Sequence, residues 1–537
     1  MSRIVPPILL LLTLAIVLGA RIAGPSDLHD KSQPKTVAYT ADMALHGHLI
    51  LPRDMVGGPA RKPPMYNWIG VPFVALFGFS EPMLKMPAIL SGIATVALIV
   101  YATRRMLQTP EVGFDEDTVR ATGWLAGIVW LACYPTFSLI YVARPDMPLV
   151  AFLTAAWILA TILLTSRRDD RSRETRTSRK GDTAPFAPRK GDTAPFAWTT
   201  AMGFWLCVAG AALTKGPPAL LPIIFALVAV KPLSGRWSTL RRLHFEWGLP
   251  LFVALFGFWA ALAWRSNPQH FWDILVGEEV TGRFSDGEPL DPYRVPKPFW
   301  LIFTWFILKF APWSILTGLV LLLVPPRRWF NHPLTPAMAW LAVVLIFFAV
   351  PEGKRQDYLA PAYPAASVLA AYSTVVLLRR LNLGKLGMTW AGLAGVALVI
   401  AYTDYQWRRS PEALERSGEH VKAFARDVRR HVPPSERIVF TELGFHPLQT
   451  LMGIHETDPP PPDALARPGW LIAPASDFPD VRSVVVSRDI PQIKQIKDAP
   501  AQIHERRSGP LGLYRLPLER TPEGATTTTR STLDGGA

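Results

Sequence analysis

The segment with the most suggestive chemistry is a polar loop, residues 52–70 (PRDMVGGPARKPPMYNWIG), which stands directly before an apolar stretch. It places Arg61 and Lys62 before two prolines and follows them with Tyr66 and Trp68. Proline stiffens the backbone, an ammonium group supplies a point charge, and aromatic rings settle at the depth of lipid headgroups. The loop is suited to hold a phosphate at a membrane surface, although a plain interface anchor has the same composition.

Three further short segments place charged side chains between apolar stretches: Arg144 and Asp146 in YVARPDMP, Lys215 in LTKGPP, and Lys354, Arg355, Asp357 and Tyr358 in PEGKRQDYLAP. Each charge taken alone could simply reach out to lipid headgroups. Ionisable groups at membrane level are costly, so four such segments together predict a polar cavity. A longer segment, residues 265–298, adds Glu278, Glu279 and Arg283.

Cations and a carboxylate at a membrane surface suit the transfer of a group from a lipid phosphate. The cations would stabilise the leaving phosphate as its charge develops, and the carboxylate would take the proton of the incoming hydroxyl.

The elements that must position these residues are membrane helices. The 537 residues are 50% hydrophobic, and the mean hydropathy is +0.20. The apolar residues occur in runs of roughly 16 to 22 with almost no charge, long enough to cross a bilayer core. We expect about eleven spans, at 4–22, 87–103, 123–142, 147–165, 198–214, 217–231, 247–264, 299–324, 337–350, 358–378 and 386–402.

Two apolar stretches have a second interpretation. The first run could be a secretory signal, since Arg3 precedes it, but no cleavage site of the A-x-A kind follows. The stretch 66–80 is short, so we expect it at the interface or as a half-span.

The formal charge of +14 does not indicate nucleic-acid binding, because the basic clusters adjoin the ends of predicted spans, at 165–180, 231–242, 325–329 and 377–385. The positive-inside rule predicts that these clusters and the N-terminus are cytoplasmic. The polar segments described above then all lie on the opposite, outer face. Cys133 and Cys207 fall within predicted spans, so no disulfide framework is expected.

The sequence predicts four regions. Residues 1–402 form a membrane domain with a first outer loop at 23–86, and 165–197 form a disordered cytoplasmic insertion that contains a tandem repeat. Residues 403–518 form an α/β domain outside the membrane, with strands at RIVFTEL, GWLIAP, RSVVVSR and GLYRLPL, and 519–537 form a disordered tail.

Motifs over residues 25–380 resemble those of a known family. YTADMALHGHLILPRD, KPPMYNW, ARPDMPLVAF, LTKGPPALLP, GEEVTGRF, APWS and KRQDYLAPAYPA follow in the order and spacing of the GT-C type membrane glycosyltransferases. The nearest groups are the aminoarabinose transferases of lipid A and the protein O-mannosyltransferases. The resemblance implies a polytopic helical fold of about 11 to 13 transmembrane helices with a small C-terminal α/β domain. It implies an inverting sugar transfer from a polyprenyl-phosphate carrier, without a nucleotide sugar, to a hydroxyl of a lipid, glycan or protein. That transfer would occur on the outer face of the cytoplasmic membrane.

The resemblance also implies roles for individual residues. The donor phosphate would be bound by Arg61, Lys62, Lys215, Lys354 and Arg355. The cavity would be lined by Asp42, Tyr66, Arg144, Glu279, Arg283 and Tyr358, in which Glu279 and Arg283 match an E-x-x-x-R-F element. Asp146 would be catalytic.

One departure affects the catalytic base. The Asp-Glu pair that the family carries in its first outer loop is replaced by Ser32 and Gln33. We expect Asp30 to act as the base; the alternatives are Asp146, Asp42 or a loss of activity. The usual His of the later loop is replaced by Val280. No ligand spacing demands a metal, and a divalent ion is compatible with the carboxylates.

Two other functions compete with the transferase. The chain could be an inactive relative that binds the lipid carrier, or a transporter or flippase of a lipid-linked sugar, although a transporter would place charges near the middle of the bilayer.

Overall fold

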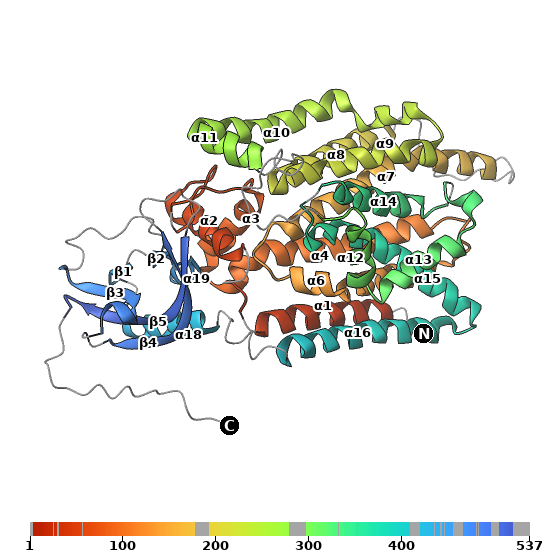
Figure 1. Cartoon of the computed structure of the whole chain (residues 1–537). Coiled ribbons are helices and arrows are strands. Elements are labelled where there is room, and N and C mark those ends of the chain that lie inside the picture. Colours follow the sequence, from red (N-terminus) through yellow and green to blue (C-terminus); the bar gives the residue numbers. More distant parts are fainter. Residues whose placement is uncertain are drawn as a thin grey trace. The chain divides into compact units, whose positions relative to one another are not determined.

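The structure is a computed structural model. It describes the chain except residues 1–3, 25, 29–31, 56, 178–192, 279–296, 331, 352, 409–418, 434, 441–442, 445, 455–465, 480, 482, 496–503 and 519–537. The chain divides into two compact units, and Figure 1 labels most of their helices and strands. The membrane unit comprises residues 1–25, 42–52 and 59–415. The sheet unit comprises residues 26–41, 53–58 and 416–537.

The membrane unit is built of helices, most of which are apolar along much of their length. They are α1 (Val5–Ala23), α3 (Met65–Phe77), α4 (Glu81–Leu107), α5 (Glu116–Leu131), α6 (Tyr134–Leu139), α7 (Asp146–Thr177), α8 (Thr193–Lys215), α9 (Leu221–Ser234), α10 (Phe245–Ser266), α11 (Pro268–His270), α12 (Leu301–Lys309), α13 (Trp313–Leu323), α14 (Thr335–Ala349), α15 (Tyr363–Arg380) and α16 (Gly384–Arg408). Helix α2 (Gln33–His46) begins in the sheet unit and ends in the membrane unit.

Among the described residues, eight helices are long and apolar enough to cross a membrane, and the bent pair α12 and α13 would make a ninth. This confirms a helical, multi-pass membrane protein, with fewer full spans than the expected eleven. The expected span 123–142 is divided between α5 and the short α6. The expected span 299–324 bends by 108° between α12 and α13, where Pro312 cannot continue the helical hydrogen bonds.

Two more stretches are shorter than a full span. The expected span 337–350 forms α14, which has 15 residues. The stretch 66–80, expected at the interface or as a half-span, forms the 13-residue α3.

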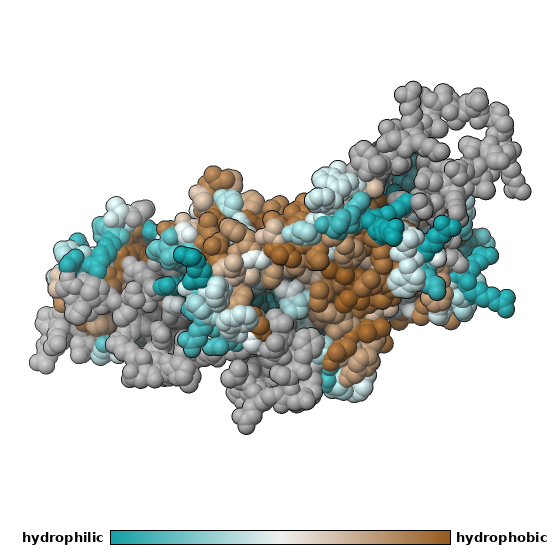
Figure 2. Space-filling model, turned by 90° about the horizontal axis from the view of Figure 1, so that it is seen from above, coloured by the Kyte–Doolittle hydropathy of each residue, from teal (hydrophilic) through white to brown (hydrophobic). Residues whose placement is uncertain are grey.

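The burial of the helices separates a protein core from a lipid-facing surface. Helix α7 and the span containing α15 are the most deeply buried, whereas α1, α10 and α16 are largely exposed. Helix α10 exposes Trp247, Val253 and Phe258, large apolar side chains that a lipid environment accommodates. Figure 2 shows the broad apolar surface over the helices of the membrane unit.

The sheet unit holds a five-stranded sheet of order β1-β3-β5-β4-β2. The strands are β1 (Ile438–Phe440), β2 (Leu443–Gly444), β3 (Gly469–Pro474), β4 (Val485–Gln495) and β5 (His504–Leu516). Strand β1 pairs with β3 in parallel, and the other pairs are antiparallel. The four expected strands are therefore confirmed as β1, β3, β4 and β5.

Alternation along the strands sends side chains to two opposite faces. Ile472 and Leu513 pack with α18 (Glu419–His431) and α19 (His446–Leu451), whereas their neighbours Leu471 and Tyr514 join a second apolar cluster. The sheet unit also includes residues 26–41 and 53–58, two parts of the stretch 23–86 that the sequence assigned to the membrane domain.

Candidate active site

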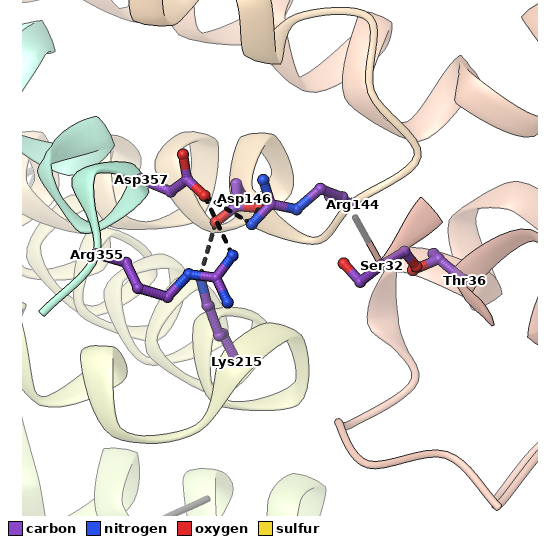
Figure 3. Close-up of polar contacts among 7 residues, drawn as sticks. All are labelled: Ser32, Thr36, Arg144, Asp146, Lys215, Arg355 and Asp357. Atoms are coloured by element: carbon purple, nitrogen blue, oxygen red, sulfur yellow. Dashed lines mark hydrogen bonds and ion pairs between the residues drawn. The ribbon is translucent and has the colours of Figure 1, made fainter. Parts of the chain in front are cut away.

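Charged residues from three separate corners of the membrane unit meet in one group, which we name the corner cluster: Arg144, Asp146, Lys215, Arg355 and Asp357 (Figure 3). Asp146 is the first residue of α7, and Lys215 is the last residue of the neighbouring α8. A carboxylate suits the N-terminus of a helix and a cation suits the C-terminus, because of the helix dipole. Arg355 and Asp357 lie at the start of a 3-10 helix, η6 (Gln356–Ala362).

The corner cluster is a continuous chain of ion pairs. Lys215 Nζ lies 2.7 Å from Asp146 Oδ1, and Arg144 Nη2 lies 3.2 Å from Asp146 Oδ2. The same Nη2 donates to Asp357 Oδ2 at 2.9 Å, and Arg355 Nη2 lies 3.7 Å from that oxygen. The side chains of Arg144 and Asp146 are 5% and 3% exposed, whereas that of Arg355 is 56% exposed. The cluster therefore runs from a buried end at Asp146 to an accessible end at Arg355.

The corner cluster carries more positive than negative charge. Arg144, Lys215 and Arg355 are cations, and only Asp146 and Asp357 are carboxylates within the group. The ammonium of Lys62 adds a further positive charge, which acts on Asp146. A site with surplus positive charge in a poorly hydrated setting favours an anion that brings its own negative charge.

A pocket of about 290 Å³ of empty space, counting its open mouth, lies against the corner cluster. Asp146, Lys215 and Asp357 form its polar side. The rest of its wall is mostly apolar: Leu149, Pro218, Phe348, Tyr358, Ala360 and Pro361. Tyr358 stacks on Phe348 with ring centroids 5.3 Å apart, and Lys215 Nζ lies 5.3 Å from the Tyr358 ring. The pocket therefore offers the ammonium of Lys215 and two carboxylates on one side, and a largely apolar surface on the other.

The loop that carries Arg61 and Lys62 is held at several points. Ala60 N donates to Pro52 O at 2.8 Å, and the His270 ring bonds Ala60 O at 2.9 Å. Arg61 and Lys62 are half-buried, just before α3. The ammonium of Lys62 is close enough to Asp146 to act on that carboxylate electrostatically.

Tyr66 and Lys354, two other expected site residues, are engaged with the backbone. Tyr66 is 1% exposed and donates its hydroxyl to Leu84 O at 2.8 Å, which joins α3 to α4. Lys354 is 2% exposed, and its ammonium donates to Pro351 O at 2.6 Å and Lys297 O at 2.8 Å. Lys297 Nζ in turn donates to Lys354 O at 2.9 Å, so the two lysines join the segment at 297 to the corner at 351–355.

Asp30, the expected base, lies outside the described residues, as do Glu279, Val280 and Arg283. Asp42 is 1% exposed and is bonded to His48 at 3.0 and 3.1 Å.

The two positions that replace the family's carboxylates make ordinary structural contacts. Gln33 is buried and donates its amide to Asp27 O at 2.6 Å. Ser32 O accepts a hydrogen bond from Thr36 Oγ1 at 3.0 Å. Figure 3 draws Ser32 and Thr36 as sticks.

Sequence reasoning missed two features, a buried ion pair and an exposed histidine. Lys85, on α4, is fully buried, pairs with Glu81 at 2.6 Å and lies 4.3 Å from the ring of Tyr141. This contact supports the turn that carries Arg144. The i,i+4 spacing of Glu81 and Lys85 at a helix start was the available signal. The other missed residue is His48, whose signal was its place six residues after Asp42.

The described part of the chain contains no group of three or more His, Cys, Asp or Glu side chains that could hold a metal ion. The carboxylates of the corner cluster, Asp146 and Asp357, each bind cationic side chains instead.

Comparisons with known proteins identify similar membrane glycosyltransferases. No protein-family model matches the chain. Over 395 residues the chain is 22% identical to an undecaprenyl phosphate-alpha-4-amino-4-deoxy-L-arabinose arabinosyl transferase of Proteus mirabilis, a match that covers 70% of this chain and 64% of that protein. A transferase of the same name from Serratia proteamaculans is 23% identical over 380 residues, which cover 69% of this chain and 60% of that protein. The matches thus span less than two thirds of these relatives.

Solved structures give a fuller match. The crystal structure of ArnT from Cupriavidus metallidurans bound to undecaprenyl phosphate superposes with a TM-score of 0.60 at 15% identity, over 88% of this chain and 96% of that chain. The oligosaccharyltransferase of Archaeoglobus fulgidus in its apo form gives a TM-score of 0.50 at 12% identity, over 89% of this chain and 70% of that chain. The chain therefore has the GT-C fold of these membrane glycosyltransferases.

Proposed function

We propose that this protein is a glycosyltransferase that takes a sugar from a polyprenyl-phosphate carrier and passes it to a hydroxyl acceptor. The observation that carries the proposal is the corner cluster, which combines surplus positive charge with a pocket that is apolar on its other side. A lipid-linked phosphate has the complementary character, an anionic head on a hydrocarbon chain. The names of the similar transferases and the undecaprenyl phosphate in the similar crystal structure support the same class of donor.

In this proposal the cations stabilise the carrier phosphate as the sugar departs. Lys62, Lys215 and Arg355 would contact its oxygens, because charge develops there in the transition state. We assign Asp146 to holding Lys215 and Arg144 in place, since both of its oxygens already face those cations. Asp30, the base expected from the sequence, lies outside the described residues.

We place the reaction at the outer face of the cytoplasmic membrane. The sequence predicts that the polar corners lie opposite the basic clusters, which the positive-inside rule assigns to the cytoplasm. The acceptor would be a hydroxyl of a lipid, a glycan or a protein.

Ligand-dependent stability tests the carrier site. The unfolding midpoint of the detergent-purified protein is measured with and without undecaprenyl phosphate, for wild type, Lys62→Ala and Lys231→Ala. Lys231 is an exposed lysine at the other end of a span and serves as the matched control. A ligand that binds only the folded state at about 100 times its Kd stabilises that state by about 2.7 kcal/mol.

We expect a raised midpoint for wild type and Lys231→Ala and a reduced response for Lys62→Ala. Inorganic phosphate at equal concentration should have little effect, because it lacks the chain that the apolar wall would bind. Equal responses of all three proteins would reject the site, and no response in any would reject the carrier.

The second candidate is an inactive carrier-binding relative, favoured by Gln33, whose amide is tied to a backbone carbonyl where the family carries a carboxylate. The two candidates differ in turnover. Incubation with radiolabelled polyprenyl-phosphate sugars and membrane lipids should release the free carrier phosphate if the transferase is correct. Carrier binding without release from any of these donors would favour the inactive relative.

A further inference from the structure

Asp42 and His48 form a carboxylate and imidazole pair close to the loop that carries Lys62. His48 Nδ1 lies 3.0 Å from Asp42 Oδ1 and 3.1 Å from Oδ2. The Asp42 side chain is 2% exposed, whereas the His48 side chain is 51% exposed. The pair therefore has a buried carboxylate and an accessible ring.

The geometry decides the role of each ring nitrogen. An ionised carboxylate only accepts hydrogen bonds, so Nδ1 must donate to Asp42. In the neutral imidazole the other nitrogen, Nε2, then carries the lone pair. A histidine whose tautomer and orientation are set by a carboxylate is the arrangement found in general bases of hydrolytic triads.

The segment after His48 is held by hydrogen bonds from α3 and α10. Trp68 Nε1 donates to Leu49 O at 2.7 Å, and Trp259 Nε1 donates to Ile50 O at 3.1 Å. The side chain of Ile50 packs in one apolar cluster with Leu213, two residues before Lys215.

This packing brings the segment that carries His48 into one apolar cluster with residues close to Lys215 and Lys62 in sequence. His48 and Lys215 each stand two residues, at most about 7 Å along the chain, from members of one cluster. Met65 and Trp68, which closely follow Lys62, belong to the same cluster. Residues 42–52 also group with the membrane unit, whereas Ser32 and Gln33 group with the sheet unit.

We propose that His48 is the general base of the transfer and that Asp42 is its positioning residue. This inference rests on the proposed function. In the step, the acceptor hydroxyl gives its proton to His48 Nε2 while its oxygen forms a bond to the anomeric carbon of the sugar. The bond from that carbon to the phosphate oxygen breaks, and its electron pair leaves with the polyprenyl phosphate. The pair supplies the proton acceptor that Ser32 and Gln33 cannot provide.

His48→Ala tests the base directly. Loss of a general base typically costs about 10²- to 10⁴-fold in rate, so we expect kcat to fall within this range. The stabilisation by undecaprenyl phosphate should stay at the wild-type level, which shows that the variant is folded. Added imidazole should restore part of the turnover, because the position is accessible. His431→Ala, an exposed histidine on α18 of the sheet unit, is the control and should keep wild-type turnover.

Asp42→Asn tests whether Asp42 acts through the ring. We expect a lower kcat with little change in KM for the acceptor, and no further loss when the change is added to His48→Ala. A structural role alone would lower kcat in both backgrounds and would not respond to imidazole.

The outcomes separate this inference from the function on which it rests. If wild type transfers sugar and His48→Ala keeps its rate, or if imidazole rescues nothing, the base assignment is overturned while the transferase stands. If wild type releases no carrier phosphate from any donor, the proposed function fails, and the base assignment fails with it.

Discussion

Asp146 holds the buried end of the corner cluster together, because its two oxygens face two different cations. Without its charge, Lys215 and Arg144 would keep their positive charges in a poorly solvated place with less compensation. Removing one partner of a buried ion pair costs more than the pair is worth, since the remaining charge stays buried.

We therefore expect Asp146→Asn to lower the free energy of unfolding by about 3–5 kcal/mol. The measurement is reversible denaturation in mixed detergent micelles. Glu116→Gln is the control, because Glu116 pairs with Arg120 on an exposed surface, where such pairs contribute about 0–1 kcal/mol. If the two substitutions lowered the free energy of unfolding equally, Asp146 would not be a buried carboxylate that holds the cations in place.

Lys354 and Arg355 are neighbours with different expected roles. Lys354→Met should destabilise the protein, because hydrogen bonds from a charged group contribute about 1.5–3 kcal/mol each and two are lost. Arg355→Ala should leave the unfolding midpoint unchanged, since the side chain is exposed, but should weaken undecaprenyl phosphate binding. Thermal shifts with and without the lipid measure both effects, and the reverse pattern would show that Lys354 is the phosphate ligand.

At the scale of elements, α8 and α10 approach closely at a glycine. Trp205 on α8 is fully buried and donates its indole N–H to Leu243 O at 2.7 Å. A Cβ added at Gly248 on α10 would overlap this indole ring. The close contact fixes the position of α8, whose last residue is Lys215.

Gly248→Ala should therefore destabilise the protein by about 1–3 kcal/mol or more, because the two helices must move apart. Gly257→Ala is the matched control on the same helix, since the nearest atom to its added Cβ lies at 3.8 Å. Alanine is the better helix former, so this control should be neutral or stabilising by up to about 1 kcal/mol. Equal unfolding midpoints for the two variants would refute the close packing.

The sequence predicted most of these elements but not their breaks. Long apolar runs define spans through composition alone, which is why α1, α4 and α16 were expected. The division between α5 and α6 and the bend at Pro312 depend on where neighbouring helices satisfy the freed backbone groups, which local composition does not encode.

At the scale of the whole molecule, the distribution of charge predicts one orientation in the membrane. Four basic clusters adjoin span ends on one predicted side, and the polar corners lie on the other. Single cysteines in a background without Cys133 and Cys207 can test this orientation.

Ser476→Cys, on the exposed surface of the sheet unit, should react with a membrane-impermeant maleimide in intact spheroplasts. Ser178→Cys, in the basic segment 165–180, should react only after permeabilisation. Mass-tag gel shifts would report both reactions, and labelling of both sites in intact spheroplasts would contradict the predicted orientation.

The sequence by itself determined a membrane protein of many helices, the residues gathered at its polar corners and four of the five strands. These follow from local properties: the length of apolar runs, the sign of flanking charge and the alternation along strands. Only the tertiary structure decided which charges meet. Arg144 and Asp357 are 213 residues apart in sequence, and Asp146 reaches Lys215 across 69 residues. Such contacts depend on how helices pack against one another, so the corner cluster and the turning of Asp42 toward His48 could be seen only in the folded chain.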